Sequence, residues 1–393
     1  MNIGIPREIQ AGETRVALLP AMVAPLKRDG HAVLVESGAG TSAGASDNDY
    51  KKAGAQIVKD VRKLYAQADV IFKVLPPGPR KGRPNHEADL VKRGTAYVGF
   101  LSPLANAQVI HTFVKNKVTS FSMEYVPRIT RAQSMDALSS MATIAGYKAV
   151  LIAADRLGKI FPLLMTAAGT VPPSSVLILG AGVAGLQAIA TAKRLGAKVE
   201  AFDPRPAVKE QVKSLGAAFL EMELPEDAET AGGYAKELSA EFLKKEQETI
   251  AERLPKVDIV ISTAQVFGKR SPVLITAKMV ELMMPGSIIV DLAAEQGGNC
   301  ELTRAGTTVQ KGGVTIVGAV NLPATIPVHA SQMYAKNVTN LFQALYPKGA
   351  TAPAFDDEVT QGCCITHEGA IQNEAVRSAL LKKGKPAKKG MKK

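Results

Sequence analysis

Cysteine is scarce in this chain, and tryptophan is absent. Three of the 393 residues are cysteines, Cys300, Cys363 and Cys364. An odd number with two adjacent members fits neither a disulfide framework nor metal-ligand spacing, so we expect buried or bystander thiols and no metal site. Aromatic residues make up 5% of the chain, and no basic cluster is interleaved with them. This composition argues against a nucleic-acid interface.

Long apolar runs are also lacking. None approaches the ~20 residues of a membrane-spanning helix. The first ten residues, MNIGIPREIQ, carry charge where a signal peptide would be apolar, so we expect a cytoplasmic chain. The formal charge is +12, and residues 382–393 contribute many lysines and no acid. Such an end is usually solvated, and attraction to an anionic membrane or an acidic partner is the alternative.

A nucleotide-binding pattern is present at residues 176–203. An apolar run ends in Gly180-Ala181-Gly182-Val183-Ala184-Gly185, an Ala-rich helical segment follows, and a second apolar run ends in Asp203. In a βαβ unit, the first glycine permits a tight turn, the second lets a pyrophosphate approach, and the third allows close helix packing. The pattern predicts a dinucleotide site, whereas an isolated GxGxxG is often only a glycine-rich turn.

Asp203 indicates which dinucleotide is bound. It follows the first glycine by about 20 residues, where a carboxylate can accept the adenine-ribose hydroxyls and repel a 2′-phosphate. Arg205 complicates this interpretation, because a guanidinium could instead meet a 2′-phosphate. We predict NAD(H) in preference to NADP(H).

The rest of the chain predicts an α/β fold with two Rossmann-like domains. Their sheets should be mostly parallel, and long helices should join them around a cleft. The predicted strands of the first domain are 2–5, 32–36, 69–74, 96–100 and 119–124; those of the second continue at 258–262, 287–291 and 314–320. Helical patterns cover 138–157 and 328–345, and 166–173 is predicted to be a loop. We expect one discontinuous domain of residues 1–137 plus 328–393, and a nucleotide domain of residues 138–327.

Three further segments carry residues of possible chemical interest. Arg15 follows a glycine turn, and Lys73 lies in an apolar run, where it is either an edge residue that snorkels or a ligand-binding residue at a strand's carboxyl end. Residues 127–136 form a polar loop with Arg, Gln and Asp. The charged insertion 221–252 contains Gly233 and Tyr234, and a tyrosine beside glycines could close over a bound nucleotide.

These motifs together resemble the NAD(H)-binding domain I of proton-translocating nicotinamide nucleotide transhydrogenases, where this domain is a separate soluble subunit. The resemblance covers almost the whole chain, and the 127–140 loop is its most specific segment. It implies that Arg128, Gln133 and Asp136 are catalytic and, with Ser139, hold the nicotinamide end of NAD(H). The remaining cofactor-binding residues that it implies are Gly180, Gly182, Val183, Ala184, Gly185, Asp203, Arg205, Gly233, Tyr234 and Gln265. For Arg128 and Asp136, a helix cap or an interdomain ion pair is the alternative.

Alanine dehydrogenases share this architecture and are the main rival. That family has a histidine where this chain has Phe100-Leu101-Ser102, and an aspartate where this chain has Glu295. Leucine cannot transfer a proton, and oxidation of an amino acid requires an acid–base group. Arg15 and Lys73 match that family's substrate-binding residues, so they resemble retained parts of a pocket whose acid–base group is missing.

The resemblance to transhydrogenases also implies a mechanism and partners. Hydride would pass directly from NADH on this chain to NADP⁺ on a partner, in a Re/Si-specific reaction coupled to proton translocation. The protein would contribute proximity and orientation. The implied partners are a second copy in a homodimer, a membrane-spanning subunit and an NADP(H)-binding domain, which would hold the chain at the cytoplasmic face of the inner membrane. A non-enzymatic NAD-binding module is a further alternative.

Overall fold

The computed structural model describes residues 1–81, 84–222, 240–266 and 268–383. The chain divides into two compact units, Met1–Met141 with Ala324–Lys393, and Ala142–Pro323. Both sheets are mostly parallel, which confirms the predicted fold class. Helix α5 (Ala137–Arg156) begins in the first unit and ends in the second, and the expected helix is therefore present.

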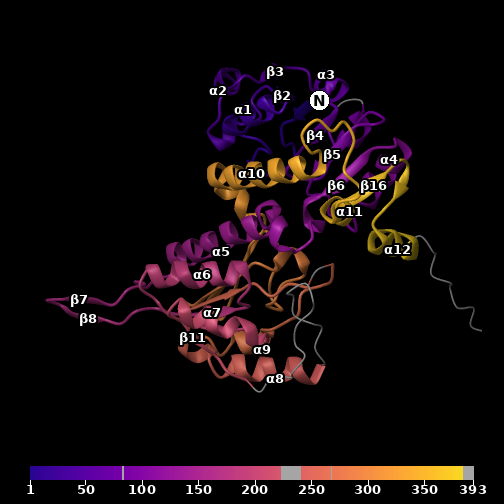
Figure 1. Ribbon diagram of the computed structural model, residues 1–393. Helices are drawn as coiled ribbons and strands as arrows, with labels where there is room; N and C mark the ends of the chain where they lie inside the picture. The colour runs from indigo at the N-terminus through magenta and orange to yellow at the C-terminus, as the bar shows by residue number, and fades with distance from the viewer. Residues whose placement is uncertain (82–83, 223–239, 267, 384–393) are drawn as a thin grey trace, which may run out of the picture. The chain divides into compact units, whose positions relative to one another are not determined.

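The first unit is built on an eight-stranded sheet in the order β17-β16-β6-β5-β4-β1-β2-β3 (Figure 1). Only β16 and β17 run antiparallel to their neighbours. Its strands are β1 (Asn2–Ile5), β2 (Ala32–Glu36), β3 (Gln56–Val58), β4 (Val70–Phe72), β5 (Ala96–Gly99), β6 (Thr119–Ser122), β16 (Cys364–His367) and β17 (Ala370–Ile371). Its helices are α1 (Pro20–Arg28), α2 (Asp47–Ala53), α3 (Val61–Gln67), α4 (Ala107–Lys115), α10 (Pro327–Leu345), α11 (Glu358–Cys363) and α12 (Glu374–Lys383).

The faces of this sheet are covered by helices with apolar sides. Phe113 of α4 and Leu64 of α3 join one buried cluster with Ile71 and Tyr97. Phe342 of α10 packs edge-on against Phe72, with ring centroids 5.4 Å apart. The chain therefore returns to the first unit through α10.

The second unit has a seven-stranded sheet in the order β11-β10-β9-β12-β13-β15-β14, parallel except for β14. The strands are β9 (Ser175–Leu179), β10 (Lys198–Phe202), β11 (Ala218–Phe219), β12 (Ile259–Ser262), β13 (Ile288–Asp291), β14 (Thr308–Lys311) and β15 (Val314–Gly318). The helices besides α5 are α6 (Val183–Arg194), α7 (Lys209–Ser214), α8 (Ala240–Ala251) and α9 (Ala277–Val280).

Side chains of β9 alternate between two cores, because successive residues of a strand point to opposite faces. Val176 and Ile178 pack with residues of α5 and α6, whereas Leu177 and Leu179 pack with residues of α8 and α9. Helices thus cover both faces of the second sheet, as parallel sheets require.

Among the described residues, α5 is the one helix long and apolar enough to cross a membrane by length and composition. Core helices of soluble proteins also meet these two criteria. Ala149, Val150 and Ala153 of α5 are buried in the core of the second unit.

The prediction of a loop at 166–173 is wrong. β7 (Leu164–Thr166) and β8 (Gly169–Val171) form an antiparallel hairpin, which extends away from the rest of its unit in Figure 1. Its two-residue turn is Ala167-Ala168 and lacks the Asn-Gly or Asp-Gly signal of common hairpins. All six strand residues are exposed.

Candidate dinucleotide site

The three glycines of the fingerprint occupy different environments. Gly180 has φ +93°, and a Cβ there would lie 2.6 Å from Oγ1 of Thr263. A Cβ on Gly185 would overlap the carbonyl oxygen of Gly180. Gly182 differs, because the nearest atom to a Cβ there is Nη2 of Arg205, at 3.8 Å. Packing within the fold therefore explains Gly180 and Gly185, whereas Gly182 borders open space into which a ligand could fit.

Helix α6 begins at this open position. Gly182 is its N-cap residue, no side chain caps the helix, and no acidic residue lies in its first turn. Val183, its first residue, is 40% exposed. On the other side, Gly146 of α5 packs so closely that a Cβ would overlap the carbonyl oxygen of Ala184. The uncapped N–H groups and the helix dipole favour an anion here, which fits a pyrophosphate.

Asp203 lies directly after β10 and is 3% exposed. One carboxylate oxygen accepts from the backbone N–H of Ala181 at 2.6 Å and from Nη2 of Arg205 at 2.8 Å. The other accepts from the backbone N–H and Nε of Arg205, both at 2.9 Å. Arg205 thus pairs with the acid that the sequence assigns to the ribose.

The polar loop predicted to hold the nicotinamide belongs to the first unit. Arg128 and Gln133 are exposed, and Gln133 lies in a short 3₁₀ helix (Thr130–Met135). Asp136 caps α5: its carboxylate accepts from the backbone N–H of Ser139 at 2.9 Å and from the Ser139 hydroxyl at 2.5 Å. A capping role for Asp136, one of the alternatives from sequence, is therefore present. The loop lies in the first unit and the glycine fingerprint in the second.

Three other predicted positions remain. Gln265 is exposed after β12, and its amide donates to the carbonyl of Leu292 at 2.9 Å. Gly233 and Tyr234 lie outside the described residues. The end of the insertion that contains them is helical, as α8.

Lys73 is fully buried at the carboxyl end of β4, an interior strand. Its ammonium donates to the two carboxylate oxygens of Glu87 at 2.7 and 2.8 Å and lies 3.4 Å from Glu8. Burial pushes the pKa of Lys73 down, but the two carboxylates outweigh it and the pKa is raised. The prediction of a snorkelling edge residue is wrong, and the position at the strand's carboxyl end is confirmed.

Arg15 is similarly occupied. Its guanidinium binds Glu13 through Nε at 2.8 Å and Nη2 at 2.6 Å, and both side chains are buried. Arg15 and Lys73, which the sequence suggests are retained parts of a substrate pocket, are therefore both held by carboxylates of this chain.

Leu101 is fully buried in the core of the first unit. Its backbone N–H and that of Ser102 donate to the carboxylate of Glu124 at 2.8 to 3.1 Å. Ser102 has a left-handed backbone with φ +43°. Leu101 is thus an apolar core residue beside an acid, Glu124, that stabilises a turn.

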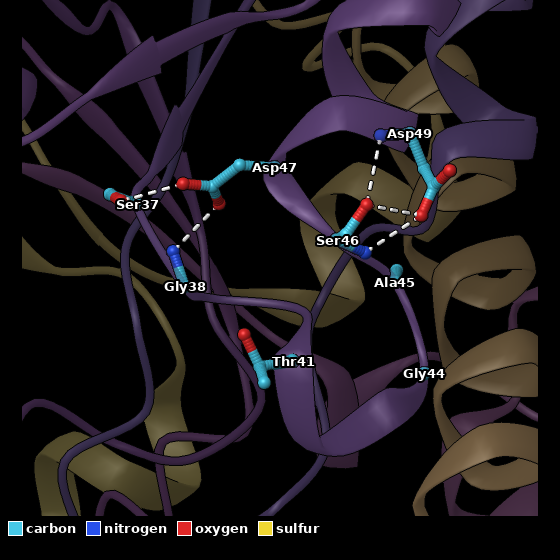
Figure 2. A pocket seen from close by; sticks show the side chains of 8 residues that line it. All are labelled: Ser37, Gly38, Thr41, Gly44, Ala45, Ser46, Asp47 and Asp49. Atoms are coloured by element: carbon cyan, nitrogen blue, oxygen red, sulfur yellow. Dashed lines mark hydrogen bonds between the residues drawn. The ribbon is translucent and has the colours of Figure 1, made fainter.

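The first unit also contains a cavity of about 400 Å³, shown in Figure 2. It is lined by Ser37, Gly38, Thr41, Gly44, Ala45, Ser46, Asp47 and Asp49. Asp47 accepts from the hydroxyl of Ser37 and the N–H of Gly38, and Asp49 forms a capping box with Ser46. Asp47 and Asp49 therefore stabilise local backbone structure. None of the residues that line the cavity is a predicted site residue.

One buried acid of the second unit is missing from the sequence prediction. Glu246 of α8 is 5% exposed. It is spaced four residues from Phe242 and from Ile250, both buried, so it lies on the apolar face of the helix. That spacing is visible in the sequence and is the signal that could have identified it.

Known protein families match this chain over nearly its whole length. The model described as "Alanine dehydrogenase/PNT, N-terminal domain" matches residues 4–145, and that of the C-terminal domain matches residues 149–374. The first part of the NAD(P) transhydrogenase alpha subunit of Rhodospirillum rubrum is 47% identical over 96% of this chain and 99% of its own length. Alanine dehydrogenase of Bacillus subtilis is 30% identical over 100% of this chain and 98% of its own length.

A solved structure supports the same assignment. A transhydrogenase from Sinorhizobium meliloti superimposes with a TM-score of 0.85 at 42% identity, covering 94% of this chain and 100% of its own. These matches confirm the resemblance stated from the sequence. The chain belongs to the alanine dehydrogenase/PNT family and is more similar to these transhydrogenases than to the alanine dehydrogenase.

Proposed function

We propose that this chain is the NAD(H)-binding subunit of a proton-translocating, Re/Si-specific transhydrogenase, and that it passes hydride between NADH and NADP⁺ held on a partner domain. The observation that carries the proposal is the open, uncapped start of α6 at Gly182. The similarity to transhydrogenase alpha subunits supports it. In this proposal, residues 138–327 bind NAD(H), and residues 1–137 with 328–393 form the family's N-terminal domain.

In this function, the residues of the chain bind and orient. The N–H groups at the start of α6 hold the pyrophosphate, with Gly180 and Gly185 shaping the turn. Asp203 and Arg205 form the adenine-ribose end, and Gln265 and the Gly233–Tyr234 segment complete the cofactor set. Arg128, Gln133, Asp136 and Ser139 orient the nicotinamide end. Bound NADH supplies the hydride, and correct orientation of two reactants is worth several kcal/mol.

At the positions that match the alanine dehydrogenase pocket, the described residues of the first unit offer no acid–base group for amino-acid oxidation. Leu101 is a core residue, and Arg15 and Lys73 are both paired with buried carboxylates. These observations favour transhydrogenation over alanine dehydrogenase activity. A protein that only binds NAD, without catalysing a reaction, would have the same glycine fingerprint. A hydride-transfer assay distinguishes such a module from a transhydrogenase subunit.

We further propose that the chain forms a homodimer. The β7–β8 hairpin supports this, because a two-stranded hairpin is marginally stable alone and needs packing against other residues. Leu163, Leu164, Met165 and Val171 on or beside it are between 38% and 73% exposed. A second copy of the chain would cover these apolar side chains.

The remaining partners are inferred from the Rhodospirillum rubrum relative, whose name describes only a portion of an alpha subunit. We propose a membrane-spanning subunit and an NADP(H)-binding domain on separate chains, with this chain at the cytoplasmic face of the inner membrane. The test is to mix the chain with a transhydrogenase NADP(H)-binding domain and follow reduction of an NADP⁺ analogue by NADH. Alanine, assayed with NAD⁺ and the chain alone, should not be oxidised.

A further inference from the structure

The carbonyl group of Ser134 is bound by two side chains of α10. Nδ2 of Asn337 donates to it at 2.9 Å and Nδ2 of Asn340 at 3.2 Å. The two asparagines are three residues apart, so they lie on one face of the helix. Ser134 lies between Gln133 and Asp136, and the loop and α10 both belong to the first unit. Helix α10 therefore holds the polar loop in the middle of the segment predicted to bind the nicotinamide.

These two bonds fix the direction of a peptide group. A carbonyl oxygen has two lone pairs, and the two amides supply a donor for each. Ser134 is near the end of the 3₁₀ helix Thr130–Met135, and the last carbonyl groups of a helix lack a partner within it. Ala132 and Met135 nearby are buried, but apolar contacts are not directional. The amides of α10 therefore orient the peptide that follows Ser134, and with it the backbone of the neighbouring site residues.

Asn337 is an unusual residue for its position. It is 6% exposed, and its Oδ1 is buried with no hydrogen-bond partner in the described part of the chain. Leaving a buried polar atom unpaired costs about 1–3 kcal/mol, so a position that served packing alone would favour an apolar residue. Turning the amide by half a rotation would place Oδ1 against the carbonyl oxygen of Ser134. The donor to Ser134 is therefore what this side chain supplies.

We propose that Asn337 and Asn340 are positioning residues for hydride transfer, acting through the carbonyl of Ser134. They hold Gln133 and Asp136 in the orientation that the nicotinamide end of NADH requires. This inference rests on the proposed function and names what orients its loop. A displacement of about 1 Å can slow a reaction about 100-fold, so loss of this anchor should affect the rate more than the binding of NADH.

A second contact of the same loop differs in kind. Arg131 binds Asp357 at 2.9 Å and Glu358 at 3.2 Å, and the arginine side chain is 45% exposed. Exposed ion pairs contribute only about 0–1 kcal/mol, because solvent screens them. The bond from Asn337 comes from a buried side chain, so α10 is the firmer anchor of the loop.

The test measures rate and binding separately. The full chain is mixed with a transhydrogenase NADP(H)-binding domain, single-turnover reduction of an NADP⁺ analogue is followed at saturating NADH, and titration calorimetry gives the NADH affinity. The variants are Asn337→Leu, Asn340→Leu and the double variant. The control is Gln343→Leu, which removes an exposed amide of the same helix that donates to Asp29 at 3.1 Å. Thermal unfolding confirms that each variant is folded.

Each single variant should slow hydride transfer about threefold to tenfold and the double variant about 100-fold, with NADH affinity within about threefold of the wild type. The control should match the wild type. Asn340 is partly exposed, so Asn340→Leu decides the question if leucine at the buried position prevents folding.

Wild-type rates in the folded variants, or an equal loss of rate in the control, overturn the inference alone. Weaker NADH binding with an unchanged rate at saturation also overturns it, because the asparagines would then affect binding and not orientation. A wild-type mixture that transfers no hydride overturns the proposed function and the inference with it.

Discussion

Gly185 lies so close to Gly180 that any side chain on Gly185 would overlap the carbonyl oxygen of Gly180. This contact joins the start of α6 to the end of β9. Gly182, between them, has no comparable neighbour, and the nearest atom to a Cβ there is 3.8 Å away. The two outer glycines therefore serve the fold, and the middle one is available to a ligand.

This difference predicts opposite effects of two alanine substitutions. Gly185→Ala should lower the free energy of unfolding by about 3 kcal/mol, because the backbone must move to admit the methyl group. Gly182→Ala should cost less than about 1 kcal/mol but weaken NADH binding at least about tenfold. Urea denaturation and calorimetry measure the two quantities. Equal loss of stability in both variants would refute the division of roles.

The nicotinamide loop can be tested without damaging α5. Asn caps helices as well as Asp does, so Asp136→Asn should retain stability within about 0.5 kcal/mol. We expect Asp136→Asn and Gln133→Asn to slow hydride transfer to an NADP⁺ analogue with a smaller effect on NADH binding. The control is Arg131→Ala, which removes exposed ion pairs with Asp357 and Glu358 in the same region. An unchanged single-turnover rate in the first two variants would remove the loop from catalysis.

Lys73 is predicted to be structural. Lys73→Ala leaves Glu8 and Glu87 buried without their cation, and such a loss costs about 3–5 kcal/mol. Lys159→Ala removes an ion pair with Asp258 whose lysine is 62% exposed, and should cost about 0–1 kcal/mol. Urea denaturation of both variants measures the contrast. A Lys73→Ala chain as stable as the wild type would show that the buried cluster contributes little.

The hairpin predicts how the chain associates. Met165 is 73% exposed, and Met165→Asp should convert a dimer into a monomer in light-scattering measurements. Leu381, another apolar side chain at 68% exposure, lies on α12 and serves as the control when changed to Asp. A monomeric wild type would contradict the proposed dimer. A dimer that tolerates Met165→Asp but dissociates on Leu381→Asp would contradict the hairpin as its contact.

Strands with continuous apolar runs were predictable from sequence. Residues 2–5 and 32–36 form β1 and β2 with the expected bounds, because parallel strands buried on both faces need apolar side chains throughout. The edge strand β3 (Gln56–Val58) and the β7–β8 hairpin were missed. Both are short. The hairpin is held by the backbone hydrogen bonds between its two strands, and its strand side chains are exposed, so no burial pattern marks it.

The site could be predicted only in part, because sequence spacing reveals what the backbone imposes locally and not which side chains meet in the folded chain. The glycines and Asp203 follow a spacing rule that the backbone itself imposes. Partners of charged side chains depend on tertiary packing, so the pairing of Lys73 with Glu87, 14 residues away, could not be read from spacing. The pairing of Arg15 with Glu13, two residues away, is the exception that local sequence could have indicated.

The most direct test of the proposed function is hydride transfer in a reconstituted mixture. The purified chain is combined with a transhydrogenase NADP(H)-binding domain, and reduction of an NADP⁺ analogue by NADH is followed in a stopped-flow instrument. We predict a fast single-turnover burst that requires both proteins and is diminished by Gly182→Ala. NADH binding to the chain with no hydride transfer in the mixture would contradict the proposal and leave an NAD-binding module.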